Sequence, residues 1–215
     1  MNTVDEISVS LQQGKSKAVR ELIQKALDEG IDAKIILEDG LLNGMGIIGE
    51  RFKNSEIYIP DVLMAAKAMS TGSELLKPYL VTSGVMAKGK VILGTVKGDR
   101  HDIGKNLVRM MMEGKGLEVI DLGVDVAAEM FVRSAIDNHA QIIACSALLT
   151  TTMGEMQKVV KTAKELNVRD KFTVMVGGAP VNDLFRKNIG ADIYAPDAAS
   201  AADAAVEACI RTILP

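Results

Sequence analysis

The sequence predicts a two-part α/β protein, with a helical bundle in residues 1–88 and a doubly wound parallel sheet in residues 89–215. In the first part, apolar residues recur at steps of three and four, which is typical of helices. In the second part, short β-branched runs alternate with amphipathic stretches, which indicates strands joined by helices. Hydrophobic residues make up 48% of the chain but aromatic residues only 3%. A core of aliphatic side chains and methionine favours helices and α/β layers over an aromatic-rich β-sandwich.

The bundle is expected to contain about four helices. Breaks in the helical pattern fall at Gly14, at residues 28–30 and at residues 54–60. Pro60 suits the start of a helix because its ring fixes the backbone of the first turn. The stretch SGVMAKGK, residues 83–90, is the expected linker and hinge between the two parts.

Five runs in the second part predict strands, namely VILGTV (91–96), LEVIDLG (117–123), QIIACS (141–146), FTVMVGG (172–178) and ADIYAP (191–196). Runs that are apolar on both faces indicate a buried parallel sheet. Their alternation with helices predicts a flavodoxin-like or Rossmann-like five-stranded domain. Ligands bind such a sheet at the carboxyl ends of its strands, so the residues that follow these runs are the candidate site.

Charge and composition exclude several classes of protein. The chain carries 25 basic and 28 acidic residues without a long basic block, so no nucleic-acid partner is expected. Cys145 and Cys209 do not form a Cys-x-x-Cys motif and are interpreted as buried residues of a reducing cytosol. The N-terminus lacks a secretory signal, and no apolar run approaches the roughly 18 residues of a spanning helix. We therefore expect a cytoplasmic protein with no membrane partner.

One motif imitates a nucleotide site. Residues 44–49 read GMGIIG, which matches the dinucleotide fingerprint letter for letter. That fingerprint requires a preceding strand, whereas the preceding segment has helical period, so these glycines are expected to let helices or a flat ligand approach closely. No zinc cluster of Cys and His is present. Asp99, His101 and Asp102 could together ligate a divalent ion, but their spacing spreads them around a loop.

Three elements occur in order after three of the predicted strands. They are Asp99-x-His101-x-x-Gly104, Ser146-x-Leu148 and Gly177-Gly178. This D-x-H-x-x-G…S-x-L…G-G pattern resembles the cobalamin-binding signature of corrinoid proteins of the methionine synthase class. The segment LEDGLLNGMGIIGERFKNSEIYIPDVLMAAKAM resembles the helical cap of that class. In size and layout the chain is similar to the free-standing corrinoid proteins of anaerobic methyltransferase systems.

The resemblance implies a role for particular residues. His101 matches the lower axial ligand of cobalt, and Asp99 is placed to accept the other ring N–H. Thr152 matches a serine that extends this relay, so these three are the implied catalytic residues. The nucleotide tail of the cofactor would enter a slot beside them. The other implied cofactor-binding residues of the second part are Gly98, Arg100, Asp102, Ile103, Gly104, Ser146, Leu148, Thr150, Gly177, Gly178 and Ala198.

The resemblance extends to the helical part, which it implies is a B12-binding cap. Phe52 and Ile59 match the apolar residues above the cobalt-bound methyl group. Glu38 and Met45 align in the same region. Each of these four residues could also belong to the ordinary core of the bundle.

The implied function is that of a methyl carrier that does not catalyse alone. Its cofactor would be cobalamin or another corrinoid, cycling between cob(I)alamin and methylcobalamin. The implied partners are a substrate:corrinoid methyltransferase, a second methyltransferase that acts on tetrahydrofolate or coenzyme M, and a reductive activase. The methyl donor (methanol, a methylamine, a betaine or a methoxylated aromatic), the acceptor and the oligomeric state stay open.

Three alternatives remain beside this interpretation. A cobalamin-dependent sensor or regulator would need an output module, although the bundle already uses residues 1–88. It would also be expected to cover an adenosyl group with aromatic side chains, and the chain has no tryptophan. The small subunit of an adenosylcobalamin mutase typically lacks the helical cap. A flavodoxin-like domain that binds no corrin would leave the three-part motif unexplained.

Overall fold

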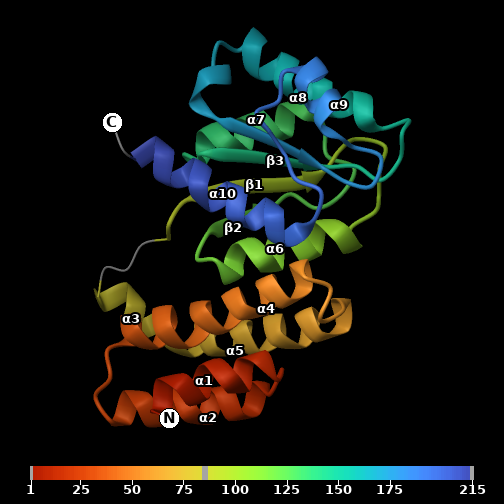
Figure 1. The fold of residues 1–215 in the computed structure, drawn as a ribbon. Coiled ribbons are helices and arrows are strands. Elements are labelled where there is room, and N and C mark those ends of the chain that lie inside the picture. Colours follow the sequence, from red (N-terminus) through yellow and green to blue (C-terminus); the bar gives the residue numbers. More distant parts are fainter. Residues whose placement is uncertain (1, 84–86, 214–215) are drawn as a thin grey trace. The chain divides into compact units, whose positions relative to one another are not determined.

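The computed structural model describes residues 2–83 and 87–213 (Figure 1). The chain divides into two compact units, Met1–Met86 and Ala87–Pro215. Residues 84–86, within the linker expected over 83–90, lie outside the described residues. No helix in the described part of the chain combines the length and the apolarity needed to cross a membrane.

The N-terminal unit is helical, as predicted. Three of its helical segments follow one another without a break and form one continuous helix, so the described residues of this unit form four continuous helices. Asn2 caps the first helix, because its side chain accepts a hydrogen bond from the backbone N–H of Asp5. Buried aliphatic residues such as Ile7, Ile23 and Leu76 fill the interior. The segments are α1 (Thr3–Gln12), α2 (Ser16–Asp28), α3 (Ala33–Ile35), η1 (Ile36–Leu42), α4 (Asn43–Lys53) and α5 (Ile59–Ser83).

Two features of this unit refine the sequence-based expectation. The segment η1 is a π-helix, a rare conformation that the apolar spacing does not reveal. Pro60 is the second residue of α5, so it lies in the first turn as expected. The carboxylate of Asp61 accepts a hydrogen bond from the backbone N–H of Tyr58 at 2.9 Å, which helps to fix the start of this helix.

The GMGIIG motif lies inside α4 and follows helical segments, so it lacks the strand that a dinucleotide site needs. A Cβ atom added at Gly44 would lie 3.0 Å from the backbone oxygen of Ser8 in α1. A Cβ atom added at Gly46 would meet nothing within 4 Å. The expectation that glycine permits close helix packing is therefore confirmed at Gly44.

The described residues of the C-terminal unit form a five-stranded sheet in the order β2-β1-β3-β4-β5, and every neighbouring pair is parallel. This is the flavodoxin-like order, and it confirms the predicted doubly wound architecture. The strands are β1 (Lys90–Thr95), β2 (Glu118–Asp121), β3 (Ile142–Ser146), β4 (Thr173–Gly177) and β5 (Ile193–Tyr194). The helices are α6 (Ile103–Gly114), α7 (Ala128–Asp137), α8 (Met153–Glu165), η2 (Arg169–Lys171), α9 (Asp183–Ile189) and α10 (Ala198–Ile213).

Helices cover both faces of the sheet. Helices α6 and α10 pack together on one face, and α7 and α8 pack together on the other (Figure 1). Phe131 of α7 is the largest fully buried side chain between the sheet and the helices α7 and α8, where it belongs to one core cluster with Ile92, Ile143 and Val159. Burial on both faces explains why the strands appear in the sequence as continuous apolar runs.

The direction of strand order reverses between β1 and β3, which are neighbours in the sheet. Their last residues pair directly, with Thr95 opposite Ser146. The loops that leave these two strands therefore begin side by side. Because ligands of doubly wound sheets bind at such a switch point, the loop after β1 and the loop after β3 form the expected binding edge.

Candidate functional site

His101 lies in the short loop between β1 and α6, next to a fully buried carboxylate. Its Nδ1 atom lies 2.7 Å from Oδ1 of Asp99, and its backbone N–H donates to the same oxygen at 3.1 Å. Asp99 is 0% exposed, whereas the His101 side chain is 51% exposed. A neutral imidazole that donates from Nδ1 keeps a lone pair on Nε2. The loop therefore presents, on a half-exposed ring, a nitrogen that could ligate a metal.

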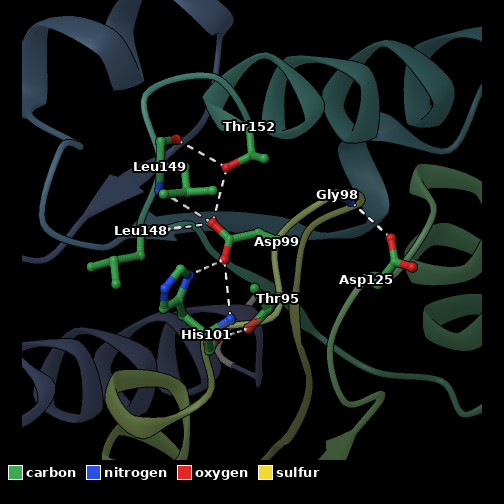
Figure 2. A network of polar contacts seen from close by, with 8 residues as sticks. All are labelled: Thr95, Gly98, Asp99, His101, Asp125, Leu148, Leu149 and Thr152. Atoms are coloured by element: carbon green, nitrogen blue, oxygen red, sulfur yellow. Dashed lines mark hydrogen bonds and ion pairs between the residues drawn. The ribbon is translucent and has the colours of Figure 1, made fainter.

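The second carboxylate oxygen of Asp99 faces the loop after β3. Oδ2 accepts hydrogen bonds from the backbone N–H groups of Leu148 at 2.8 Å and Leu149 at 3.2 Å (Figure 2). It also accepts from the hydroxyl of Thr152 at 2.9 Å. Burial raises the pKa of Asp99, but the hydrogen bonds from His101, Leu148 and Thr152 outweigh burial and hold the pKa well below its usual range. Asp99 is therefore an anion that joins the two loops of the switch point.

Thr152 has two acceptors within reach of one hydroxyl proton. Its Oγ1 atom lies 2.9 Å from Asp99 Oδ2 and 2.9 Å from the backbone oxygen of Leu149. A hydroxyl donates once, and an ionised carboxylate is the stronger acceptor. Thr152 therefore donates to Asp99, and hydrogen bonds join His101, Asp99 and Thr152 in sequence. The relay role of this chain of hydrogen bonds stays a prediction.

Apolar and small residues lie along the edge of the sheet that carries the imidazole. Leu148 is 45% exposed and Ile103, the first residue of α6, is 74% exposed. Exposed apolar side chains at an edge that also offers an imidazole nitrogen suit a flat, largely apolar ligand. The remaining expected contacts all lie in the loops or element ends at this edge, with Gly98, Arg100, Asp102, Gly104, Thr150 and Gly178 exposed, Ser146 and Gly177 partly buried, and Ala198 buried.

Gly178 occupies a position that no other residue fits. Its φ is +129°, and an added Cβ atom would lie 1.9 Å from the backbone oxygen of Ala147. The close approach joins the loop after β4 to the loop after β3, so the protein's own backbone supplies one reason for glycine there.

Gly178→Ala is expected to lower the free energy of unfolding by about 2 kcal/mol, because the backbone must move away from Ala147. Urea unfolding of the apoprotein measures this change. Gly104→Ala is the matched control at the same edge, since a Cβ atom there meets nothing within 4 Å. Equal stability of the two variants would contradict the expectation.

The four residues expected in the cap lie in the N-terminal unit. Glu38 in η1 and Ile59 at the start of α5 are exposed, and Phe52 in α4 is partly buried. Met45 is only 1% exposed and counts among the core residues. Their roles toward a cofactor stay predictions.

Two acidic residues at the end of β2 and in the segment that follows it were not singled out in the sequence. Asp121 forms an ion pair with Lys105, which is 2% exposed, and Asp125 accepts a hydrogen bond from the backbone N–H of Gly98 at 2.8 Å. Both flank a predicted strand end in the run DLGVD, and that position was the available signal. Within the described residues, no three His, Cys, Asp or Glu side chains are grouped so as to hold a metal ion.

Known proteins resemble the chain over nearly its full length. The B12 binding domain family matches residues 89–206, and a second family with the same description matches residues 3–77. Corrinoid protein DSY3155 of Desulfitobacterium hafniense (strain Y51) is 42% identical over 208 residues, which cover 95% of this chain and 96% of that protein. Trimethylamine corrinoid protein 1 of Methanosarcina acetivorans is 42% identical over 180 residues, which cover 83% of each chain.

A solved structure shows the same fold. A chain in the crystal structure of the methanol:cobalamin methyltransferase complex MtaBC from Methanosarcina barkeri matches with a TM-score of 0.85 and 30% identity. The match covers 99% of this chain and 84% of that chain. The family matches and the relatives agree, and the chain belongs to the family of corrinoid proteins built from B12 binding domains.

Proposed function

We propose that this protein carries a methyl group on its bound corrinoid from a donor methyltransferase to an acceptor methyltransferase. The observation that carries the proposal is the His101 ring, which is half exposed and tied through Nδ1 to a buried anion. Relatives named as trimethylamine and dimethylamine corrinoid proteins support the same role. When bound, the corrinoid supplies the cobalt centre that accepts the methyl group and gives it up.

The residues at the switch point fit a corrinoid. A histidine that ligates the metal would have to offer an unprotonated nitrogen, and the contact from Nδ1 to Asp99 leaves that nitrogen at Nε2 of His101. Exposed Leu148 and Ile103 offer apolar surface at the same edge of the sheet. The close approach of Gly178 to Ala147 keeps the strand-end loops free of side chains at that point.

The mechanism assigns three linked tasks to the protein. His101 would hold the cobalt through Nε2, and Asp99 accepts the proton of Nδ1, which fixes the ring orientation and would raise the basicity of the ligand. Thr152 and the amides of Leu148 and Leu149 hold Asp99 ionised and in place. The ring thereby keeps one tautomer while its other nitrogen remains available.

The remaining edge residues are assigned to the nucleotide tail and the lower surface of the cofactor. The loops after β3 and β4 would form the slot for the tail, because both leave the carboxyl ends of the strands. The residues assigned to the slot and the surrounding edge are Gly98, Arg100, Asp102, Ile103, Gly104, Ser146, Leu148, Thr150, Gly177, Gly178 and Ala198.

We assign residues 1–88 to a cap and residues 89–215 to the cobalamin-binding domain. In the cap, Phe52 and Ile59 would exclude water from the methyl group, with Glu38 and Met45 beside them. We expect such a cap to move for each partner, since apolar side chains that shield the methyl group would block its transfer.

The partners follow from the reaction. A substrate:corrinoid methyltransferase supplies the methyl group, a second methyltransferase passes it to tetrahydrofolate or coenzyme M, and a reductive activase restores the cofactor when it is oxidised. The donor is selected by the first partner. We place the protein in the cytoplasm with these enzymes.

His101→Ala tests the proposal without any partner. The visible absorption of bound methylcobalamin should shift to that of a form without nitrogen ligation. His139→Ala is the matched control, because His139 is exposed and is the other of the two histidines. A His101→Ala spectrum that equals the wild-type spectrum would remove His101 from the metal and refute the proposal.

A further inference from the structure

The loop that carries His101 is held on a second side, by the residues that follow β2. The backbone N–H of Thr95 donates to the oxygen of Gly123 at 2.9 Å, and the N–H of Val126 donates to the oxygen of Thr95 at 3.0 Å. Val96 and Val126 then form an isolated parallel bridge. The segment after β2 therefore extends the sheet pairing past the end of β1, up to the loop of the ligand.

Asp125 makes the contacts nearest to the site. Its Oδ1 atom accepts a hydrogen bond from the backbone N–H of Gly98 at 2.8 Å (Figure 2). The same oxygen lies 3.1 Å from Nζ of Lys97. The backbone N–H of Asp125 donates to the oxygen of Asp99 at 2.9 Å. One residue thus binds the Gly98–Asp99 dipeptide at both ends.

The backbone of Asp125 makes this double contact possible. Its φ is +58°, in the left-handed region that aspartate and asparagine tolerate better than most residues. In this conformation the N–H and the carboxylate both reach the same neighbouring loop. An acceptor oxygen is needed at Oδ1, because both of its contacts are donors.

We propose that Asp125 is a positioning residue for the metal ligand, an inference that rests on the proposed function of His101. Asp125 fixes the backbone of Gly98 and Asp99, and this sets the position from which the Asp99 side chain extends. That carboxylate must reach His101 with one oxygen and the loop after β3 with the other. Without Asp125 the backbone of this loop shifts. The Asp99 carboxylate then no longer reaches both His101 and the backbone N–H of Leu148 at their present distances.

Two variants separate the carboxylate from the backbone conformation. Asp125→Gly keeps the left-handed backbone accessible but leaves the Gly98 N–H without its acceptor. Asp125→Asn keeps an acceptor oxygen and tolerates the same φ, but it removes the charge beside Lys97. We expect Asp125→Gly to lower the equilibrium constant for nitrogen ligation of bound methylcobalamin by about tenfold, the effect typical of residues that orient a metal ligand. Asp125→Asn should stay within about twofold of wild type.

The measurement uses two readouts. The visible spectrum of bound methylcobalamin reports ligation by His101. In the apoprotein, ¹⁵N-histidine NMR reports the ring tautomer, and only two histidines contribute signals. Asn167→Gly is the matched control, because Asn167 is exposed and also left-handed, with a φ of +55°. It should change neither readout.

The outcomes separate this inference from the proposed function. If wild type and His101→Ala differ but Asp125→Gly equals wild type in both readouts, the positioning role is refuted. If wild type and His101→Ala share one spectrum, the proposed function fails. The positioning role is then tested only by the His101 tautomer that ¹⁵N-histidine NMR detects in Asp125→Gly, and an unchanged tautomer refutes it. Should Asp125→Gly not fold, Asp125→Ser replaces it with the same expected shift, since Ser55 already adopts a φ of +59° in this chain.

Discussion

Replacing Asp99 with alanine is expected to lower the free energy of unfolding of the apoprotein by about 4 kcal/mol. The carboxylate is fully buried and accepts five hydrogen bonds, two from His101 and one each from Leu148, Leu149 and Thr152. Alanine leaves the donors of His101, Leu148 and Leu149 without this acceptor, whereas the Thr152 hydroxyl can still donate to the backbone oxygen of Leu149. Each buried donor without a partner costs about 1 to 3 kcal/mol, reduced where water enters. Urea unfolding measures the loss, and ¹⁵N-histidine NMR should show that the His101 ring no longer favours one tautomer.

Three comparison variants make this expectation specific. Thr152→Val removes a single donor and should cost about 1 kcal/mol, whereas Thr152→Ser keeps the hydroxyl and should cost less. Asp183→Ala removes an exposed carboxylate that pairs with Arg186 and Lys187, so it should change stability by less than about 1 kcal/mol. If Asp99→Ala were as stable as Asp183→Ala, Asp99 would not hold the two loops together.

The second large effect is expected from Asp121→Asn, at about 3 kcal/mol. Lys105 is 2% exposed, and its ammonium group contacts Asp121 and the side-chain oxygen of Asn106. Neutralising Asp121 leaves this buried cation without its counter-charge. Lys105→Met should cost less, because Asp121 still accepts hydrogen bonds from Arg109 at 3.3 Å and from the N–H of Gly123 at 2.9 Å.

The pH dependence of this effect follows from the pKa of Asp121. Burial raises the pKa, but the hydrogen bonds from Lys105 and Gly123 and the charges of Lys105 and Arg109 outweigh it, so the pKa lies below its ordinary value. A group with a lowered pKa in the folded state stabilises the protein above its unfolded pKa of about 3.9, and this contribution is lost as the pH falls through the folded pKa. The difference in unfolding free energy between wild type and Asp121→Asn should therefore shrink between pH 7 and pH 3. A difference that is equal at both pH values would contradict the ion pair.

The sheet could be predicted because parallel strands covered on both faces appear in sequence as unbroken apolar runs. The contact between Asp99 and His101 could also be predicted from the sequence, since these residues are two positions apart in one loop. Thr152 is 53 residues from Asp99, and only the resemblance to a known family placed it there. Motif order can thus supply a long-range contact where local pattern supplies none.

The contacts of Asp121 and Asp125 could not be predicted in the same way. They depend on the register of β2 against β1, in which Leu93 lies opposite Asp121. Apolar periodicity identifies a strand but does not fix which residue faces which across the sheet. The π-helix was missed for a related reason, because its hydrogen-bond pattern alters the helical spacing only locally.

The π-helix also affects how this chain tolerates changes in length. In η1 each turn takes up more residues than in the α-helices on either side, because the backbone bonds reach one residue further. A shorter homologue that lacks one amino acid between Ile36 and Leu42 would close this stretch into regular α-helix. The side chains of α3 and α4 would then keep the orientation they now have toward the rest of the bundle. In an ordinary α-helix the same deletion would rotate everything after it by about 100°, whereas here the change is confined to η1.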